Sequence, residues 1–285
     1  MTQTVSHRPL APLGAEITGV DLSKDIEPNT IEEILRILHE RGVILFRNQN
    51  LQDEDMLRFG RKFGYDLEKH LLLKSELMIF SNMLKDGKPV GLSDGGQFWH
   101  SDGSHSVPHM YTILYGVEIP HDANGEPLGD TLFSSTTTVY DDLPADLKEK
   151  LNGVQGVFKF DVSYRKRKGK NKDSVAAPEQ LEKPPVLHPV CRPHPLTGKK
   201  SIFVNEGYVT HLEGLPRAEG DAILKDLLER VKADRYVYRH RWKKGDLLMW
   251  DNSATQHCAV PDYRLPQTRL MKRIVLKSSK SGVPA

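Results

Sequence analysis

Apolar residues recur at helical spacing early in the chain and predict a helix that leads into a buried strand. The predicted helix begins with a candidate capping box formed by Thr30 and Glu33 and stops at Gly42. Its buried face consists of Ile31, Ile34, Leu35 and Leu38. The apolar run 43–46, which directly follows the glycine, is typical of a short buried strand.

Similar patterns predict further helices along the chain. One spans residues 53–63 and ends at Gly64. Pro144 suits the first turn of another helix, because its fixed φ matches the helical value and its missing N–H would have no partner there. A last helix starts near Pro216, and its apolar face consists of Ile223, Leu224, Leu227, Leu228 and Val231.

Strand patterns dominate the rest of the chain. Apolar and β-branched runs are bounded by turn residues, and 244–246 (Lys-Gly-Asp) is a tight turn signal between two of them. The predicted strands cover residues 111–117, 200–204, 235–242, 247–250 and 268–276. This pattern predicts a mainly β fold with flanking helices, in which a β-barrel or jelly-roll core has the helices packed outside. No repeat or long low-complexity segment interrupts the chain, so one domain is expected over residues 1–285.

Two polar stretches lack this periodicity and are interpreted as surface loops. Residues 86–98 are rich in Gly, Asp and Ser and are expected to form a flexible loop beside the mouth of the barrel. Residues 165–172 (Arg-Lys-Arg-Lys-Gly-Lys-Asn-Lys) form a basic cluster, which is interpreted as a mobile, solvated loop. An anion-steering lid or a nucleic-acid patch is the alternative interpretation of this cluster.

Composition and charge narrow the class of protein. The formal net charge of +2 over 285 residues does not require nucleic acid or an anionic membrane as partner. Cys191 and Cys258 cannot form a disulfide framework and have no Cys-x-x-Cys spacing, so a reducing compartment is expected. The first residues lack the basic and apolar segments of a secretory signal. No apolar run approaches the roughly 20 residues that a membrane helix needs. A cytoplasmic protein is therefore expected.

A His-x-Asp triplet is the first candidate metal-binding motif. On an extended chain residues i and i+2 point to the same side, so His100 and Asp102 can bind one ion together. His257 is a candidate third ligand, because it follows a turn and a buried strand and is expected just beyond the strand end. Two histidines and one carboxylate on one face of iron leave positions open for substrate and oxygen. Each signal alone is weak, since the chain has 12 histidines and an isolated His257 is more typical of a surface or core residue.

The strand predicted over 268–276 adds buried cations. Arg269 and Arg273 share one face by the strand period of two, Lys272 lies on the other face, and both faces are otherwise apolar. A buried arginine requires an anionic partner, which is either a structural carboxylate or a bound ligand held by the planar guanidinium. A metal triad beside such an arginine suits 2-oxoglutarate. This keto acid chelates iron through its keto and C1 carboxylate oxygens, and its far carboxylate needs a cation and a hydroxyl donor.

Several ordered motifs resemble the family of taurine dioxygenase and 2,4-dichlorophenoxyacetate dioxygenase, which are Fe(II)/2-oxoglutarate-dependent oxygenases. The resemblance extends over nearly the whole chain. Residues 99–102 (Trp-His-Ser-Asp) look like the iron motif of the family, and 129–133 (Gly-Asp-Thr-Leu-Phe) are similar to its co-substrate threonine motif. The other matching segments are 13–22, 212–216, 238–242 and 250–252, and the last three are most similar to the phenoxyacetate branch.

The resemblance implies a double-stranded β-helix (jelly-roll) fold and a role for each matching residue. The residues implied as iron ligands, and hence as catalytic, are His100, Asp102 and His257. Thr131 and Arg269 would hold the distal carboxylate of 2-oxoglutarate, with Trp250 lining its site. Without the resemblance, Thr131 would be interpreted as an ordinary strand hydroxyl and Trp250 as a core aromatic residue.

The resemblance also indicates the substrate side of the site. Arg273 would face an anionic group of the substrate, and His70 and His211 lie near positions that the family uses around it. Gly96 stands where the taurine enzyme has a substrate-contacting asparagine, which argues against taurine itself as the substrate. Relatives form dimers or tetramers, so a homodimer or homotetramer is expected.

The predicted reaction is the hydroxylation of a small anionic organic compound with release of succinate and CO₂ from 2-oxoglutarate. If the hydroxylated carbon bears oxygen or sulfur, the product would fragment. Asp102 favours hydroxylation over halogenation, because family halogenases have a small residue in place of the carboxylate ligand. Desaturation, cyclisation and epimerisation at the same iron site are alternatives. Others are a nucleic-acid-modifying 2-oxoglutarate oxygenase, a zinc hydrolase and a non-catalytic metal-binding barrel.

Overall fold

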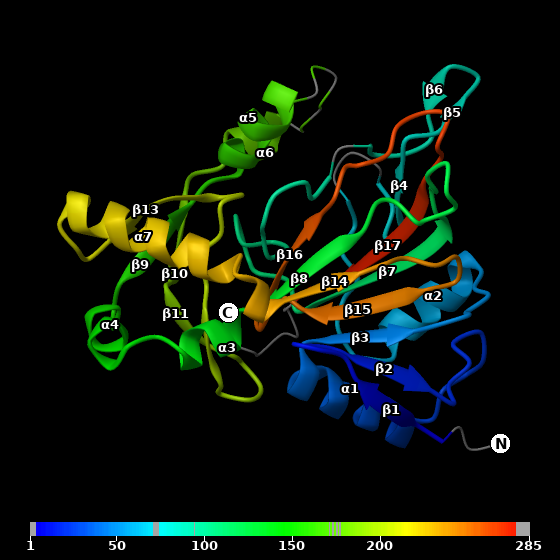
Figure 1. The fold of residues 1–285 in the computed structure, drawn as a ribbon, viewed down its shortest axis with the longest axis horizontal. Helices are drawn as coiled ribbons and strands as arrows, with labels where there is room; N and C mark the ends of the chain where they lie inside the picture. The colour runs from blue at the N-terminus through cyan, green and yellow to red at the C-terminus, as the bar shows by residue number, and fades with distance from the viewer. Residues whose placement is uncertain are drawn as a thin grey trace.

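Two sheets form the centre of the computed structural model, which describes residues 4–70, 74–93, 95–170, 172, 174, 176 and 178–277 (Figure 1). The larger sheet has the strand order β1 (Ser6–Pro9), β2 (Ala15–Thr18), β3 (Val43–Phe46), β15 (Leu247–Asp251), β7 (Tyr111–Glu118), β17 (Leu270–Leu276) and β4 (Met78–Ser81). The smaller sheet has the order β14 (Val237–His240), β8 (Thr131–Ser135) and β16 (Thr255–Ala259). The pairing of β2 with β3 is parallel, and the other pairings in these two sheets are antiparallel.

Side-chain alternation along the strands divides the core into two layers. Val43 and Leu45 of β3 pack in one cluster with Phe133 of the smaller sheet, so this layer fills the space between the sheets. Ile44 and Phe46 point to the opposite face, where α1 (Pro28–Arg41) and α2 (Asp53–Arg61) cover the larger sheet (Figure 1). The predicted mainly β fold with helices packed outside is confirmed.

Helix α1 is present as predicted, but it does not start at the predicted capping box. It begins at Pro28, whose fixed φ suits the first helical turn, and it ends at Gly42 with φ 73°. Thr30 is buried inside the helix, and Glu33 pairs with Arg36 at 2.7 Å rather than with the helix start. The predicted capping box is therefore wrong.

The other predicted helices are confirmed with adjusted ends. Helix α2 ends at Arg61 rather than at residue 63. Helices α4 (Ala145–Lys150) and α7 (Arg217–Val231) each begin directly after a proline. Helix α7 packs on β13 (Val209–Glu213). In the described part of the chain, no helix combines the length and apolarity that crossing a membrane requires.

The chain between β8 and β14 builds a second assembly, seen at the left of Figure 1. It contains the sheet of β10 (Val186–Pro189), β9 (Gln155–Phe158) and β13, the hairpin of β11 (Cys191–Pro193) and β12 (Lys200–Ile202), α3 (Thr136–Asp141), α4 and α7. A turn of 3-10 helix, η1 (Asp234–Tyr236), leads from α7 into β14. The strand predicted over 235–242 is therefore present only over Val237–His240, and the one predicted over 200–204 only over Lys200–Ile202.

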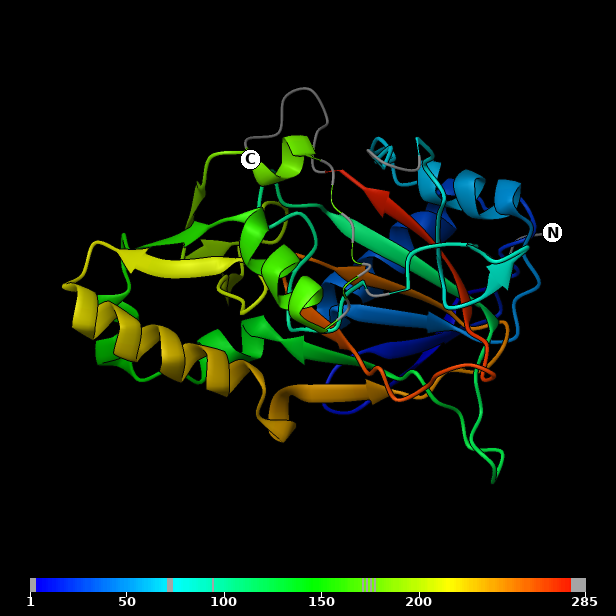
Figure 2. The ribbon, with the colours of Figure 1, turned by 90° about the horizontal axis from the view of Figure 1, so that it is seen from above.

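Both predicted loops contain regular structure. Residues 165–170 belong to α5 (Phe160–Lys170), so a loop is wrong there, although Arg165, Lys166 and Lys168 are exposed to solvent as predicted; residue 171 lies outside the described residues. Figure 1 shows α5 beside the short α6 (Pro178–Leu181) at the top of the second assembly, and Figure 2 shows this region from above. Within 86–98, β6 (Lys88–Pro89) pairs with β5 (Leu84–Lys85), and the Leu92 N–H donates to the Ile79 carbonyl at 2.9 Å.

Candidate metal centre

Two histidines that are far apart in the sequence are joined by a backbone bridge. The His100 N–H donates to the His257 carbonyl at 3.1 Å, and the His257 N–H donates to the His100 carbonyl at 2.9 Å. The bridge brings the ring centroids within 4.2 Å of each other. His257 lies inside β16, so the expectation that it lies just beyond a strand is wrong. The reason is that the chain turns after β15 and at once forms another strand.

Asp102 completes a cluster whose geometry suits one metal ion. Its Oδ1 lies 3.6 Å from His100 Nε2, and its Oδ2 lies 3.8 Å from His257 Nε2. These distances are too long for hydrogen bonds but let the three ligand atoms reach a shared ion. All three side chains are buried. The structure thus brings the three predicted ligands together.

The charge states of these groups also suit a metal. Burial would raise the pKa of Asp102, but the Arg273 guanidinium and the two imidazoles lower that pKa well below its usual value. Burial lowers the pKa of His100, and burial together with His100 lowers the pKa of His257. The cluster therefore offers an ionised carboxylate and neutral imidazoles, which are the forms that bind metal ions.

Hydrogen bonding fixes the tautomer of His100. Its Nδ1 lies 2.8 Å from the Phe98 carbonyl, which can only accept, so Nδ1 carries the proton and Nε2 offers its lone pair to the cluster.

The buried Nδ1 of His257 has no hydrogen-bond partner among the described residues. Gly96 has φ +76°, and a Cβ there would lie 3.3 Å from His100 Cε1. This donor set fits the Fe(II) that the resemblance implies.

A cavity of about 50 Å³ adjoins the cluster, and we call it the Arg269 cavity. Its lining includes His100, His257, Thr131, Trp250, Arg269 and Arg273. Arg269, directly before β17, and Arg273 within it therefore lie on one side, as the strand period predicts. Arg273 also donates through Nη2 to Asp102 Oδ1 at 2.7 Å, so it contacts a candidate metal ligand directly.

Two residues of the Arg269 cavity are held by neighbours from the matching segments 238–242 and 129–133. Trp242 Nε1 donates to Thr131 Oγ1 at 3.0 Å, so the Thr131 hydroxyl proton stays available for another acceptor. Arg269 donates through Nη2 to the Gly129 carbonyl at 3.3 Å, and its buried Nε has no partner in the described part of the chain. A hydroxyl beside a buried guanidinium is suited to binding a carboxylate.

A second cavity of about 150 Å³, here called the Arg167 cavity, shares His100 and Arg273 with the first. Arg167 of α5 lines it and is partly buried, whereas Arg165, Lys166 and Lys168 of the same helix are exposed. The aromatic residues that line this cavity are Phe80, Phe98, Phe160 and Tyr208. Among the described residues of the basic stretch, Arg167 is the cation that lines this cavity.

The two histidines predicted near the substrate lie in different places. His70 lines the Arg167 cavity. His211 lines neither cavity, because it belongs to β13 in the second assembly. Its Nδ1 bonds Thr210 at 2.9 Å and its Nε2 lies 3.9 Å from Glu213. The structure does not support a position for His211 beside the substrate.

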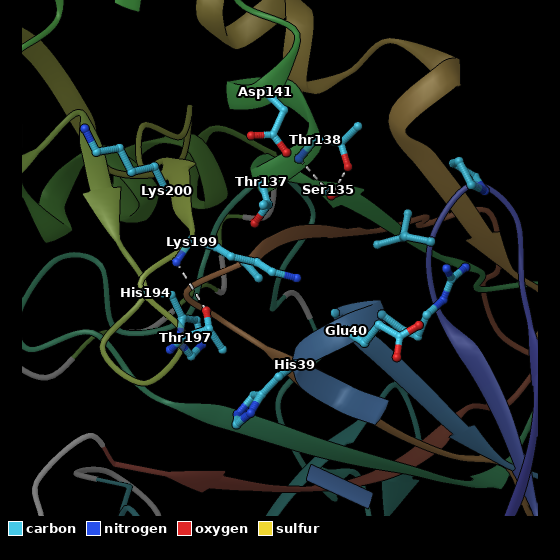
Figure 3. A pocket seen from close by; sticks show the side chains of 15 residues that line it. His39, Glu40, Ser135, Thr137, Thr138, Asp141, His194, Thr197, Lys199 and Lys200 are labelled. Carbon is cyan, nitrogen blue, oxygen red and sulfur yellow. Dashed lines mark hydrogen bonds between the residues drawn. The ribbon is translucent and has the colours of Figure 1, made fainter. Parts of the chain in front are cut away.

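His39, His194 and Asp251 form the other cluster of metal-capable side chains among the described residues. Figure 3 shows His39 and His194 at the edge of a pocket of about 340 Å³. The Nδ1 of His194 accepts hydrogen bonds from the backbone N–H groups of Leu196 and Thr197, both at 3.1 Å. Its Nε2 therefore carries the proton and donates to Asp251 Oδ2 at 2.7 Å. Because a metal needs a lone pair on that nitrogen, this cluster is a structural hydrogen-bond network and not a metal site.

Comparisons with known proteins agree with this geometry. Residues 6–275 match the family model described as taurine catabolism dioxygenase TauD, TfdA family. The chain is 34% identical over 272 residues to an alpha-ketoglutarate-dependent 2,4-dichlorophenoxyacetate dioxygenase of Cupriavidus pinatubonensis, which covers 89% of this chain and 91% of that protein. It is 32% identical over 288 residues to an alkylsulfatase of Acinetobacter baylyi, covering 96% of this chain and 86% of that protein.

The fold is also that of a solved structure. AAD-2 in complex with Mn(II) and N-oxalylglycine superimposes with a TM-score of 0.79 at 25% identity, covering 97% of this chain and 98% of that chain. The jelly-roll class and the resemblance predicted from the sequence are thereby confirmed. The chain belongs to the taurine catabolism dioxygenase TauD, TfdA family.

Proposed function

We propose that this enzyme hydroxylates a small anionic organic compound bound in the Arg167 cavity. As a member of its family the chain is a 2-oxoglutarate-dependent dioxygenase that uses Fe(II), 2-oxoglutarate and O₂. The observation that carries the proposal is the buried cluster of two neutral histidines and an ionised aspartate directly beside two arginines.

Each residue of the site has an assigned task. The assigned metal ligands are His100, Asp102 and His257. Arg269 and Thr131 bind the far carboxylate of 2-oxoglutarate, and Trp250 forms a wall of its site. Phe80 and Leu114 line the same cavity and exclude water from it.

The reaction balances with one O₂ per substrate molecule. Bound Fe(II) supplies the activation of O₂, coupled to the oxidative decarboxylation of 2-oxoglutarate. One oxygen atom enters the succinate that forms with CO₂, and the other replaces a C–H hydrogen of the substrate as hydroxyl. The contribution of the protein is to hold both organic molecules beside one metal position and to keep water out.

The Arg167 cavity supports an anionic substrate with an apolar body. Arg167 and Arg273 supply positive charge, and the stacked rings of Phe160 and Tyr208, with centroids 6.5 Å apart, supply an aromatic wall. The relatives described above are named for a phenoxyacetate and for alkyl sulfates, and compounds of both kinds have this construction.

The proposed function is tested by a substrate screen. The protein is loaded anaerobically with Fe(II) and 2-oxoglutarate, and O₂ uptake and succinate are measured after addition of 2,4-dichlorophenoxyacetate, hexyl sulfate or taurine. We expect an aryl or alkyl anion to accelerate O₂ uptake above the rate without substrate, and taurine to have less effect because of Gly96. Succinate formation that does not require iron would contradict the assignment.

Arg167→Ala is expected to raise the KM of the accelerating compound about tenfold, because a partly exposed charge-assisted hydrogen bond would be lost. The KM for 2-oxoglutarate is expected to stay unchanged, since Arg167 does not line the Arg269 cavity. Steady-state O₂ uptake measures both constants. Arg165→Ala is the matched control, because Arg165 lies on the same helix but is exposed. Equal KM values for the accelerating compound in the two variants would show that Arg167 does not contact the substrate.

A further inference from the structure

A chain of hydrogen bonds behind Asp102 connects this residue to the wall of the Arg269 cavity. Thr112 Oγ1 donates to Asp102 Oδ2 at 2.7 Å, and Asn252 Nδ2 donates to Thr112 Oγ1 at 3.1 Å. The other end of the same carboxamide, Asn252 Oδ1, accepts from the Asp102 backbone N–H at 3.2 Å and from Trp250 Nε1 at 3.1 Å. Asn252 is therefore bonded on both sides of its amide group.

The direction of every bond in this network is determined. The indole of Trp250 and the backbone N–H of Asp102 can only donate, so the oxygen of Asn252 must face them. Its NH₂ group then faces Thr112, and the Thr112 hydroxyl is left with Asp102 as its acceptor. Only one arrangement of protons satisfies all four bonds.

The network is fully removed from solvent. Thr112 and Asn252 are 0% and 1% exposed. The pairing of β7 with β15 sets Thr112 opposite Trp250, which places the hydroxyl and the carboxamide together behind the metal cluster. Inside a core of low polarity such a network is strong when complete and costly when broken. A buried arrangement of this kind fixes the orientation of the carboxylate that ends it.

We infer that Asn252 is a positioning residue for both the metal and the co-substrate. Its nitrogen orients the Asp102 carboxylate through Thr112, and its oxygen orients the backbone of Asp102 and the indole of Trp250. The inference rests on the proposed assignment of Asp102 as a metal ligand and of Trp250 to the 2-oxoglutarate site.

The test measures Mn(II) binding to the metal-free protein and N-oxalylglycine binding to the Mn(II)-saturated protein by calorimetry. Thr112→Val and Asn252→Ala are each expected to weaken Mn(II) binding about 10- to 100-fold, as the loss of a partner that orients a metal ligand does. The double variant is expected to bind Mn(II) within about threefold of the weaker single variant, because both changes break one chain. Thr112→Ser keeps the hydroxyl and is expected to restore wild-type binding.

The measurement of N-oxalylglycine binding distinguishes the role of the Asn252 oxygen from that of its nitrogen. Asn252→Ala is expected to weaken N-oxalylglycine binding by about 3- to 10-fold, because the Trp250 indole loses its buried acceptor. Thr112→Val leaves that bond intact and is not expected to cause this additional loss. Asn205→Ala is the matched control. Asn205 is also 1% exposed and also donates and accepts through its amide, but its partners are Ser104 and Tyr208.

Three results would overturn the inference. These are wild-type Mn(II) affinity in Thr112→Val, a double variant in which the two losses multiply, and an equal loss in Asn205→Ala. Failure of the wild-type protein to bind Mn(II), or binding that survives His257→Ala, would instead overturn the proposed function on which the inference rests.

Discussion

Replacing His257 with alanine is expected to lower succinate formation from 2-oxoglutarate by about 1,000-fold or more, since changing a residue that merely orients a ligand already costs about 10- to 100-fold. The variant is also expected to lose stoichiometric Mn(II) binding. The physical reason is that His100 and Asp102 alone cannot form the three-ligand face that holds the ion. Metal content after dialysis and succinate formation measure the two effects.

His194→Ala is the matched control for this prediction. His194 is equally buried and also contacts an aspartate, but its proton lies on the nitrogen that a metal would need. We expect this variant to keep one Mn(II) per chain and to lose stability, because the hydrogen bonds to Leu196, Thr197 and Asp251 disappear. Metal loss in His194→Ala combined with metal retention in His257→Ala would reverse the assignment of the two clusters.

Replacing Arg269 with alanine is expected to weaken N-oxalylglycine binding to the Mn(II) form by about 100-fold or more. Two charge-assisted hydrogen bonds to a carboxylate contribute about 1.5–3 kcal/mol each, and about 1.4 kcal/mol corresponds to a factor of ten in affinity. Arg269→Lys is expected to recover part of the loss, because lysine keeps the charge but not the planar fork. Calorimetry measures the dissociation constants, and Mn(II) affinity is expected to stay within about threefold, because Arg269 does not contact the three ligands.

Arg239→Ala serves as the control for Arg269. Arg239 pairs with Asp130 at 2.6 Å next to Thr131, but its side chain is 54% exposed and lines neither cavity. We expect N-oxalylglycine to bind this variant as it binds the wild type. An equally weak affinity in both variants would show that the effect comes from disturbing β8 rather than from a contact with the far carboxylate.

The parts of the site that follow a strand period could be predicted from the sequence. Arg269, the residue before β17, and Arg273 of β17 are separated by an even number of positions, and both line the Arg269 cavity. His100 and Asp102 are two positions apart and their side chains meet. In these cases the local backbone alone determines which side chains share a face.

Residues whose partners come through sheet register could not be predicted in this way. Thr112 lies in an apolar strand and Asn252 in the turn after β15, and nothing in the sequence indicates that β7 and β15 are neighbours. Trp242 lies in the matching segment 238–242, but its contact with Thr131 comes through the pairing of β14 with β8, which the sequence does not indicate. The family motif 250–252 is the one signal that includes Asn252.

Helix α5 was missed for a different physical reason. The side of the helix that lines the Arg167 cavity carries Phe160, Ser163 and Arg167, which are spaced as on one helical face. Phe160 of this face packs in the apolar core, but Ser163 and Arg167 are polar where the face borders the cavity. The usual alternation of apolar and polar positions is therefore absent, and the basic residues on the exposed side suggest a loop.

The central claim is tested most directly by a crystal structure of the protein with Mn(II) and N-oxalylglycine. We predict one Mn(II) bound by the Nε2 atoms of His100 and His257 and by the carboxylate of Asp102, with the far carboxylate of N-oxalylglycine on Arg269 and Thr131. Mn(II) at the cluster of His39, His194 and Asp251, or an inhibitor carboxylate remote from Arg269, would contradict it.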